Sequence, residues 1–393
     1  MSASCIKNCL ACGRCANFPI LDEFRLLVKA HEPRVGYGIA IDIGTTTVVL
    51  ALLDLERGNI VARHSMINPQ RVFGPDIISR IDAANKGHLD EQCRMIRDCI
   101  AEGINKLLAY KSILHKSNIP MSIAGNTTMM YLLFGFSCES LGVSPFKPKY
   151  SLADRCASDL FEIGQSDNNI YIFPWLAAFV GGDITSGLMY VLSEGKERFL
   201  LIDLGTNGEM ALYESGRLIV TSTAAGPAFE QPSDNHLVHG ASDTVSGLAQ
   251  LIRNGVLDRA GKLNADAAVN FTQKQIRELQ LAKSAVRSGL EILIETARFS
   301  YSDLDAVYLA GGIGQAMVVN DAIEIGLIPR ELGDKTHAAG NAALGGAVHA
   351  LLAPAHAAAG IENILTNVSE INLALHINFN NYFIKYMFFD RNI

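Results

Sequence analysis

The sequence predicts an α/β protein of two similar lobes, with a short cysteine-rich segment ahead of them. The first observation is an internal repeat, because residues 41–45 and 202–206 both read apolar-Asp-apolar-Gly-Thr. Each copy follows an apolar run and opens a hairpin, so the repeat indicates two lobes of the same design. The second observation is a glycine-rich turn at residues 311–314, after another strand of buried type at 306–310.

The composition is that of a folded protein with room for two cores. The chain has 393 residues, of which 49% are hydrophobic and 19% charged,. The net charge of -7 argues against nucleic acid or an anionic membrane as the main partner,. The first residues hold cysteines where a signal peptide needs an apolar core, and no apolar run is long enough to span a bilayer,. These features predict a soluble, cytoplasmic protein.

Changes of pattern along the chain predict five segments. A cysteine-rich segment and a linker helix precede the two lobes, and a closing segment follows them; the expected bounds are 1–20, 21–35, 36–198, 199–352 and 353–393.

In the first lobe, apolar runs between turn residues predict a two-stranded hairpin and two more strands, at 39–53, 60–68 and 121–124,. Helical spacing predicts a long helix over residues 76–111, interrupted at Gly87,. A further helix follows Gly125, and Thr127 or Thr128 is its expected N-cap,.

The second lobe repeats this arrangement. Strands are expected at 199–203, 209–213, 218–222 and 306–310,. Apolar residues on one side predict a long helix over 274–297, and a run of small residues predicts a closely packed helix over 338–352,.

The paired turns carry residues suited to a polyphosphate and Mg²⁺. Glycine lets the backbone approach a phosphate, threonine and backbone N–H groups donate to its oxygens, and an Asp at a strand end can hold Mg²⁺. One such turn alone is an ordinary hairpin. Two copies followed by a turn that leaves room for a base and ribose predict a divided ATP site, formed by Asp42, Gly44, Thr45, Thr46, Thr47, Asp203, Gly205, Thr206, Asn207, Gly208, Glu209, Gly311, Gly312 and Gly314.

The order of these motifs resembles that of the actin-like ATPase superfamily. The matching parts are a first phosphate loop, a first connecting segment, a second phosphate loop, an adenosine loop and a second connecting helix, at 42–47, 125–126, 203–209, 311–314 and 340–351. The resemblance implies two hinged lobes of the ribonuclease-H-like fold that close on Mg-ATP.

Shorter segments resemble the ATPase domain of the reductive activators of corrinoid proteins. These segments are 68–70, 74–81, 124–129, 145–146, 181–183 and 224–230. The likeness covers about residues 36–393; it implies a closing strand and helix over 370–389, and places Gly226 near the phosphates. Members of that family carry a larger electron-transfer domain ahead of the ATPase region, where this sequence has the short cysteine segment.

The resemblance also implies an activity and its partners. ATP would drive one electron from an upstream low-potential donor, through an iron–sulfur centre, to the cob(II)amide centre of a corrinoid protein. This returns the corrinoid protein of a methyltransferase system to the cob(I) state.

Four of the eight cysteines lie within eleven residues, as Cys5, Cys9, Cys12 and Cys15. Their spacing suits a [4Fe–4S] cluster, with a Cys₄ zinc site or no metal as the alternatives. The redox activity of the family that the chain resembles favours iron–sulfur. Cys93 and Cys99, on the long helix, are expected to be buried structural thiols.

Four further residues have two interpretations each. Asp183 is expected to orient or deprotonate the attacking water, or to cap the helix at 184–192,. Asn126 contacts phosphate or braces its turn, and Glu209 reaches the metal or is a solvated strand residue. For Arg80 we expect a surface salt bridge or a position facing a partner.

Two other functions remain open from the sequence. One is a small-molecule kinase of the same superfamily, against which the cysteine cluster and the lack of a polyol-binding loop both count. The other is a non-catalytic, nucleotide-gated module of the chaperone type. A homodimer is compatible with any of these.

Overall fold

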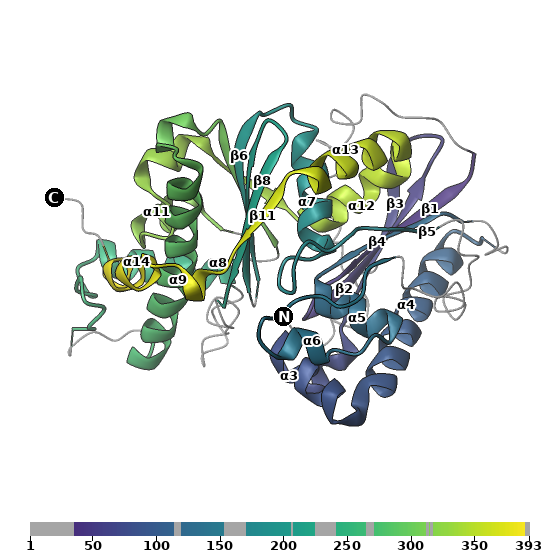
Figure 1. Ribbon diagram of the computed structural model, residues 1–393, viewed down its shortest axis with the longest axis horizontal. Coiled ribbons are helices and arrows are strands. Elements are labelled where there is room, and N and C mark those ends of the chain that lie inside the picture. Colours follow the sequence, from purple (N-terminus) through teal and green to yellow (C-terminus); the bar gives the residue numbers. More distant parts are fainter. Residues whose placement is uncertain are drawn as a thin grey trace. The chain divides into compact units, whose positions relative to one another are not determined.

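The computed structural model describes residues 35–113, 119–152, 170–205, 207–224, 241–264, 271–311, 314 and 317–389. These residues form an α/β protein of two compact units (Figure 1). The first unit runs to Glu194 and also contains Ala342–Thr366; the second contains Gly195–Asn341 and the chain from Asn367 onward. This division differs from the expected one, because residues 342–352 pack with the first unit and the expected closing segment is shared between both.

The first unit is built on a five-stranded mixed sheet of order β3-β2-β1-β4-β5. The strands are β1 (Tyr37–Ile43), β2 (Thr47–Asp54), β3 (Asn59–Ile67), β4 (Met121–Gly125) and β5 (Ile170–Ile172). Strand β1 pairs antiparallel with β2 and parallel with β4, while β5 is parallel to β4. The predicted hairpin and the two strands after it are confirmed.

The helices of the first unit are η1 (Pro69–Phe73), α3 (Ile77–Ala83), η2 (Ala84–His88), α4 (Leu89–Tyr110), α5 (Thr127–Phe134), α6 (Glu139–Gly142), α7 (Gly182–Leu192), α12 (Ala342–Leu352) and α13 (Pro354–Thr366). The predicted break at Gly87 is confirmed by its φ of 102°, a value open to glycine,. The N-cap prediction for α5 was wrong. Asn126 is the cap, because its side-chain oxygen accepts from Met129 N at 2.9 Å,.

Helices cover both faces of the first sheet. Ile41 and Ile123 are fully buried in one core with residues of α4 and α5. Ser122, next to Ile123 on β4, therefore points to the other face, where its hydroxyl donates to Ala347 O of α12. Ser186 of α7 also bonds to this helix, through Ala343 O at 2.6 Å.

The second unit repeats the sheet of the first. Its order is β10-β9-β6-β7-β8-β11, with strands β6 (Arg198–Leu204), β7 (Gly208–Glu214), β8 (Arg217–Thr223), β9 (Ala306–Ala310), β10 (Thr336–Gly340) and β11 (Val368–Ile371). Strand β6 has the place of β1, antiparallel to β7 and parallel to β9. The register repeats as well, since Asp42 lies opposite Ala124 and Asp203 lies opposite Ala310 on the parallel neighbours.

The helices of the second unit are α8 (Ala241–Arg253), α9 (Gln273–Ala297), η7 (Tyr301–Asp303), α11 (Val319–Glu324), η8 (Arg330–Lys335), η9 (Leu373–Leu375) and α14 (Phe379–Tyr386). The helix predicted over 338–352 begins only at Ala342, because residues before it pair with β9 as strand β10. Small residues fit both conformations, so the pattern could not separate them. In the described part of the chain, no helix combines the length and apolar character needed to cross a membrane.

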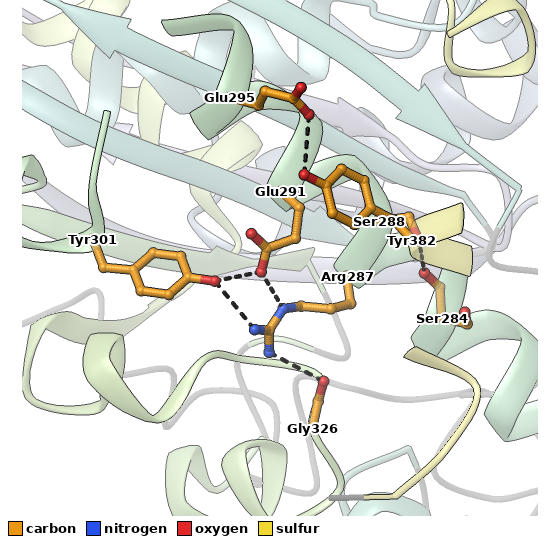
Figure 2. A network of polar contacts seen from close by, with 8 residues as sticks. All are labelled: Ser284, Arg287, Ser288, Glu291, Glu295, Tyr301, Gly326 and Tyr382. Atoms are coloured by element: carbon orange, nitrogen blue, oxygen red, sulfur yellow. Dashed lines mark hydrogen bonds and ion pairs between the residues drawn. The ribbon is translucent and has the colours of Figure 1, made fainter. Parts of the chain in front are cut away.

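Polar contacts join the C-terminal helix α14 and the short helix η7 to α9 (Figure 2). Arg287 Nε donates to Glu291 Oε1 at 2.8 Å, and the Tyr301 hydroxyl donates to the same carboxylate. One turn further along α9, Glu295 accepts from the Tyr382 hydroxyl of α14 at 3.1 Å. The strand and helix expected at the end of the chain are thus confirmed as β11 and α14, and they belong to the second unit.

Candidate functional site

The first candidate half-site lies where β1 ends, in the first unit. Asp42 is the second-last residue of β1, and the chain then turns through residues 44–47 into β2. Gly44 N donates to Thr47 O at 3.0 Å across this turn. A Cβ at Gly44 would lie 2.7 Å from Thr47 O, so the turn can close this tightly only with glycine,.

Three consecutive carbonyl groups of this turn are bound by two residues. Asn68 Nδ2 donates to Gly44 O at 2.9 Å, and Asn68 N donates to Thr46 O at 3.0 Å. Arg80 Nη2 donates to the carbonyl between them, Thr45 O, at 2.6 Å. No residue in the described part of the chain accepts a hydrogen bond from the N–H groups of Thr45 and Thr46. The turn therefore has its acceptors occupied and donors available, as an anion site requires.

Asn126 joins this turn to the neighbouring strand and helix. It follows β4 and caps α5, and its Nδ2 donates to Thr45 Oγ1 at 3.0 Å. The preceding Gly125 lies against β1, where a Cβ would be 2.9 Å from Ile43 O. Of its two interpretations, the structure shows Asn126 bracing the turn.

Asp183 is positioned next to Asn126 by two glycines. A Cβ at Gly181 would lie 2.4 Å from Asn126 Cα, and one at Gly182 would lie 3.1 Å from Gly125 O. The segment before Asp183 therefore packs directly on the backbone at the start of α5.

The ionisation of Asp183 is shifted toward the neutral range. Asp183 lies in the first turn of α7, whose N-cap is Gly181, and it accepts from Ile184 N at 2.8 Å. Burial raises the pKa of this carboxyl from 3.8 to about 6, against the hydrogen bond from Ile184, which lowers it,. At neutral pH the group is ionised, yet it is a stronger base than an exposed aspartate.

The second half-site has the same plan in the second unit. Asp203 is the second-last residue of β6, and Gly205 N donates to Asn207 O at 2.9 Å in the turn that follows. Glu209, near the start of β7, is 6% exposed and lies directly opposite Asp203. Its interpretation as a solvated strand residue is therefore wrong. Two carboxylates directly opposite each other at the end of a strand pair are oxygen ligands of the kind that Mg²⁺ prefers,.

Gly311 lies against the Asp203 carboxylate. Its φ is 81°, and a Cβ there would be 2.3 Å from Asp203 Oδ1 and 2.6 Å from Leu204 O. At Gly314 a Cβ would lie 2.8 Å from the Leu309 carbonyl carbon. Glycine at 311 therefore keeps the backbone close to the end of β6, and glycine at 314 keeps it close to β9. The other predicted residues of this half, Thr206, Gly226 and Gly312, lie outside the described residues.

The donor set fits Mg²⁺. In the described part of the chain, no three His, Cys, Asp or Glu side chains are arranged to hold a metal ion by themselves. Mg²⁺ bound with a nucleotide needs only one or two carboxylates, since water and phosphate oxygens supply the other ligands. In the first unit Asp42 provides such a carboxylate at a strand end, and in the second unit Asp203 and Glu209 do. Cys5, Cys9, Cys12 and Cys15 lie outside the described residues, whereas Cys93 and Cys99 are buried, as predicted.

Sequence reasoning missed the roles of Asn68 and Arg80. Arg80 was expected at the surface, but it is fully buried and bonded to the first turn. A single arginine in a helical pattern carries no sign of such burial. The available signal was the preceding Asn68-Pro69 pair, which is typical of a capped turn; Asn68 accepts from Gln70 N at 3.0 Å and caps η1,.

The duplicated sheets, with Asp42 and Asp203 in equivalent register, define an α/β protein of the actin-like ATPase (ASKHA) class, the fold predicted from the sequence. Residues 197–249 and 233–392 match the family described as the C-terminal domain of RACo, the ASKHA domain. Residues 37–193 match the family described as the RACo middle region. The chain belongs to the RACo family.

Named relatives agree with this assignment. The chain is 31% identical over 422 residues to the corrinoid activation enzyme RamQ of Eubacterium limosum, covering 90% of this chain and 70% of RamQ. It is 23% identical over 363 residues to a Co(II) methylated amine-specific corrinoid protein reductase of Methanosarcina barkeri, with 75% and 66% covered. A solved reductive activator for a corrinoid, iron-sulfur protein has 29% identity and a TM-score of 0.77, with 92% and 67% covered.

Proposed function

We propose that this protein is an ATP-dependent iron–sulfur activator that reduces an inactive cob(II)amide corrinoid protein to the cob(I) state. The observation that carries the proposal is the repeated strand end, Asp42 to Gly44 and Asp203 to Gly205, in a chain of the RACo family. Relatives whose names describe corrinoid activation support the substrate class. They also favour this function over a small-molecule kinase.

In the proposed function, each of the two turns binds phosphate oxygens of Mg-ATP. The N–H groups of Thr45 and Thr46 donate to phosphate oxygens, and Thr47 adds a hydroxyl group. Asp42 and Asp203 hold Mg²⁺ directly or through water, with Glu209 beside Asp203,. The equivalent second turn at Gly205, Thr206, Asn207 and Gly208 also binds phosphate, together with Gly226, and the turn at Gly311, Gly312 and Gly314 takes the adenosine.

Asp183 is the proposed base for hydrolysis. Its carboxylate accepts a proton from the water that attacks the terminal phosphorus, and the bond to the leaving ADP oxygen breaks as the new bond forms. Burial keeps this carboxylate basic, because it raises its pKa to about 6,. ADP and inorganic phosphate are the products.

The electron step is a one-electron transfer. An iron–sulfur cluster bound by Cys5, Cys9, Cys12 and Cys15 would supply the electron when loaded. With a cluster held by these cysteines, the transfer would balance as one electron: Co(II) of the corrinoid protein would become Co(I), and an upstream low-potential donor in the cytoplasm would resupply the electron. ATP can drive this step only if the complex with the corrinoid protein differs in free energy between the nucleotide states.

An anaerobic reconstitution tests the proposal. The purified chain is analysed for iron, zinc and its EPR spectrum, and its ATPase activity is measured with and without an oxidised corrinoid protein. We expect iron, a cluster signal on reduction, and Co(I) absorbance that develops only with ATP and a low-potential reductant. A zinc protein without iron would overturn the redox role, and ATP-dependent phosphorylation of a small molecule would favour a kinase. Binding of ATP without turnover would favour a nucleotide-gated module.

A further inference from the structure

Arg80 is a buried cation that contacts no carboxylate among the described residues. Its side chain, on α3, is 0% exposed. Its Nη2 donates to Thr45 O at 2.6 Å, its Nε donates to Gly74 O at 3.2 Å, and its Nη1 lies 3.4 Å from Met129 Sδ. Among the residues described, none of its partners is an acid.

The guanidinium keeps its charge at neutral pH. Burial and the nearby Arg71 lower the pKa of Arg80 to about 10, while Asp76 acts in the opposite direction,. The Asp76 carboxylate is itself engaged by Ser79 N at 2.9 Å and by the Ser79 hydroxyl. A buried charge is costly unless a charge of opposite sign compensates it.

Arg80 lies next to the place where a negative charge is expected. It bonds to the carbonyl of Thr45, and Thr45 and Thr46 have N–H groups available for an anion. A polyphosphate on that turn would polarise the peptide groups in the same direction as the guanidinium does. The guanidinium and a bound polyphosphate would therefore attract each other through the peptide group between Thr45 and Thr46.

We propose that Arg80 is a positioning residue for phosphate recognition, which fixes the first turn through Thr45 O and places beneath it the positive charge that a bound polyphosphate compensates. This inference rests on the proposed nucleotide function. It concerns a residue that does not touch the ligand, so its removal affects ligands in proportion to their negative charge.

Calorimetric titrations of the full chain test the proposal. Wild type, Arg80→Lys and Arg80→Gln are each titrated with Mg-ATP, inorganic tripolyphosphate and adenosine. Lysine keeps the charge, whereas glutamine keeps a donor for Thr45 O without it. The control is Arg71→Gln, which removes a neighbouring but exposed arginine. Thermal unfolding without ligand is measured for every variant.

We expect Arg80→Gln to weaken the binding of ATP and of tripolyphosphate by at least about tenfold, because a charge-assisted interaction is lost. Adenosine affinity should change by less than about twofold, Arg80→Lys should retain most of the phosphate affinity, and Arg71→Gln should resemble wild type.

Equal losses of affinity for adenosine and ATP would overturn the role of charge, and so would a lysine variant that binds phosphate no better than the glutamine variant. If the glutamine variant does not fold, a lysine variant within about threefold of wild type for tripolyphosphate supports the proposal, and a larger loss overturns it.

The two proposals fail in different ways. A wild-type chain that binds tripolyphosphate but not ATP overturns the nucleotide function, and a loss in Arg80→Gln then still supports the role of Arg80. If the wild type and Arg80→Gln bind ATP equally tightly, the proposed role of Arg80 is overturned and the nucleotide function is not. If the wild type binds neither ligand, both proposals are overturned.

Discussion

Asn126 Nδ2 donates a hydrogen bond to Thr45 Oγ1 at 3.0 Å. The same carboxamide accepts from Met129 N through its oxygen and thereby caps α5. One side chain thus fixes both the start of a helix and the turn between β1 and β2. Stability and ligand binding should therefore change together when Asn126 is altered.

Replacement of Asn126 by alanine should lower both quantities. The lost cap costs about 1 kcal/mol of unfolding free energy, and the released Thr45 hydroxyl should weaken ATP binding by about tenfold. Denaturant unfolding and calorimetric titration measure the two effects. Thr272→Ala is the matched control, because Thr272 caps α9 in the second unit. It should cost similar stability and leave ATP affinity unchanged; an Asn126→Ala variant with wild-type ATP affinity would contradict the tether.

Replacement of Asp183 by asparagine should separate binding from hydrolysis. The variant keeps the size of the side chain but cannot accept the proton of the attacking water, so ATPase activity should fall by about 10²- to 10⁴-fold. ATP affinity should change little, since Asp183 is not proposed to bind phosphate. Asp82→Asn, on the exposed surface of α3, should behave as wild type. Full ATPase activity in Asp183→Asn would assign the catalytic base elsewhere.

The raised pKa of Asp183 has a consequence for stability. Between pH 3.8 and about pH 6, this carboxyl is protonated in the folded protein and ionised in the unfolded chain. Stability contributed by this group is therefore greatest at low pH and declines as pH rises through that interval, by at most about 1.4 kcal/mol per pH unit. Asp183→Asn should thus gain stability relative to wild type as pH rises from 4 to 7. Denaturant midpoints across this range measure the difference, and a constant or opposite difference would show that the pKa is not raised.

The sequence revealed the repeat but not the contacts that support it. Apolar runs and glycine turns predicted both hairpins, because strand alternation and turn chemistry are local properties. The burial of Arg80 could not be predicted, since it depends on Gly74, Thr45 and Met129, which come together only in the folded unit. The prediction that α12, residues 342–352, belongs to the second lobe was wrong for the same reason. Its small residues predicted close packing, but the partner is α7 of the first unit, through Ser186.

The close packing of α12 on α7 can be tested by comparing the stability of two glycine-to-alanine variants of α12. A Cβ at Gly346 would lie 1.9 Å from Ser186 O, whereas one at Gly345 would lie 2.7 Å from a ring carbon of Tyr190. A helix backbone cannot move aside as a side chain can, so Gly346→Ala should destabilise by about 3 kcal/mol or more and Gly345→Ala by about 1–3 kcal/mol. Chemical denaturation gives both values. Equal losses would mean that α7 shifts as readily as the tyrosine ring.

The cysteine cluster should be separable from the ATPase. We expect Cys9→Ala to lose most of the bound iron and all ATP-dependent formation of Co(I), because a [4Fe–4S] cluster uses four thiolates. ATP hydrolysis without a corrinoid protein should persist within about twofold, since the proposed nucleotide residues all lie after residue 41. Cys93→Ala removes a buried thiol of α4 and should keep both iron and electron transfer. Iron analysis, EPR and the Co(I) absorbance band measure these outcomes, and chelation of iron from the wild type should reproduce the Cys9→Ala result. A Cys9→Ala variant that still forms Co(I) at the wild-type rate would show that the electron reaches cobalt by another path.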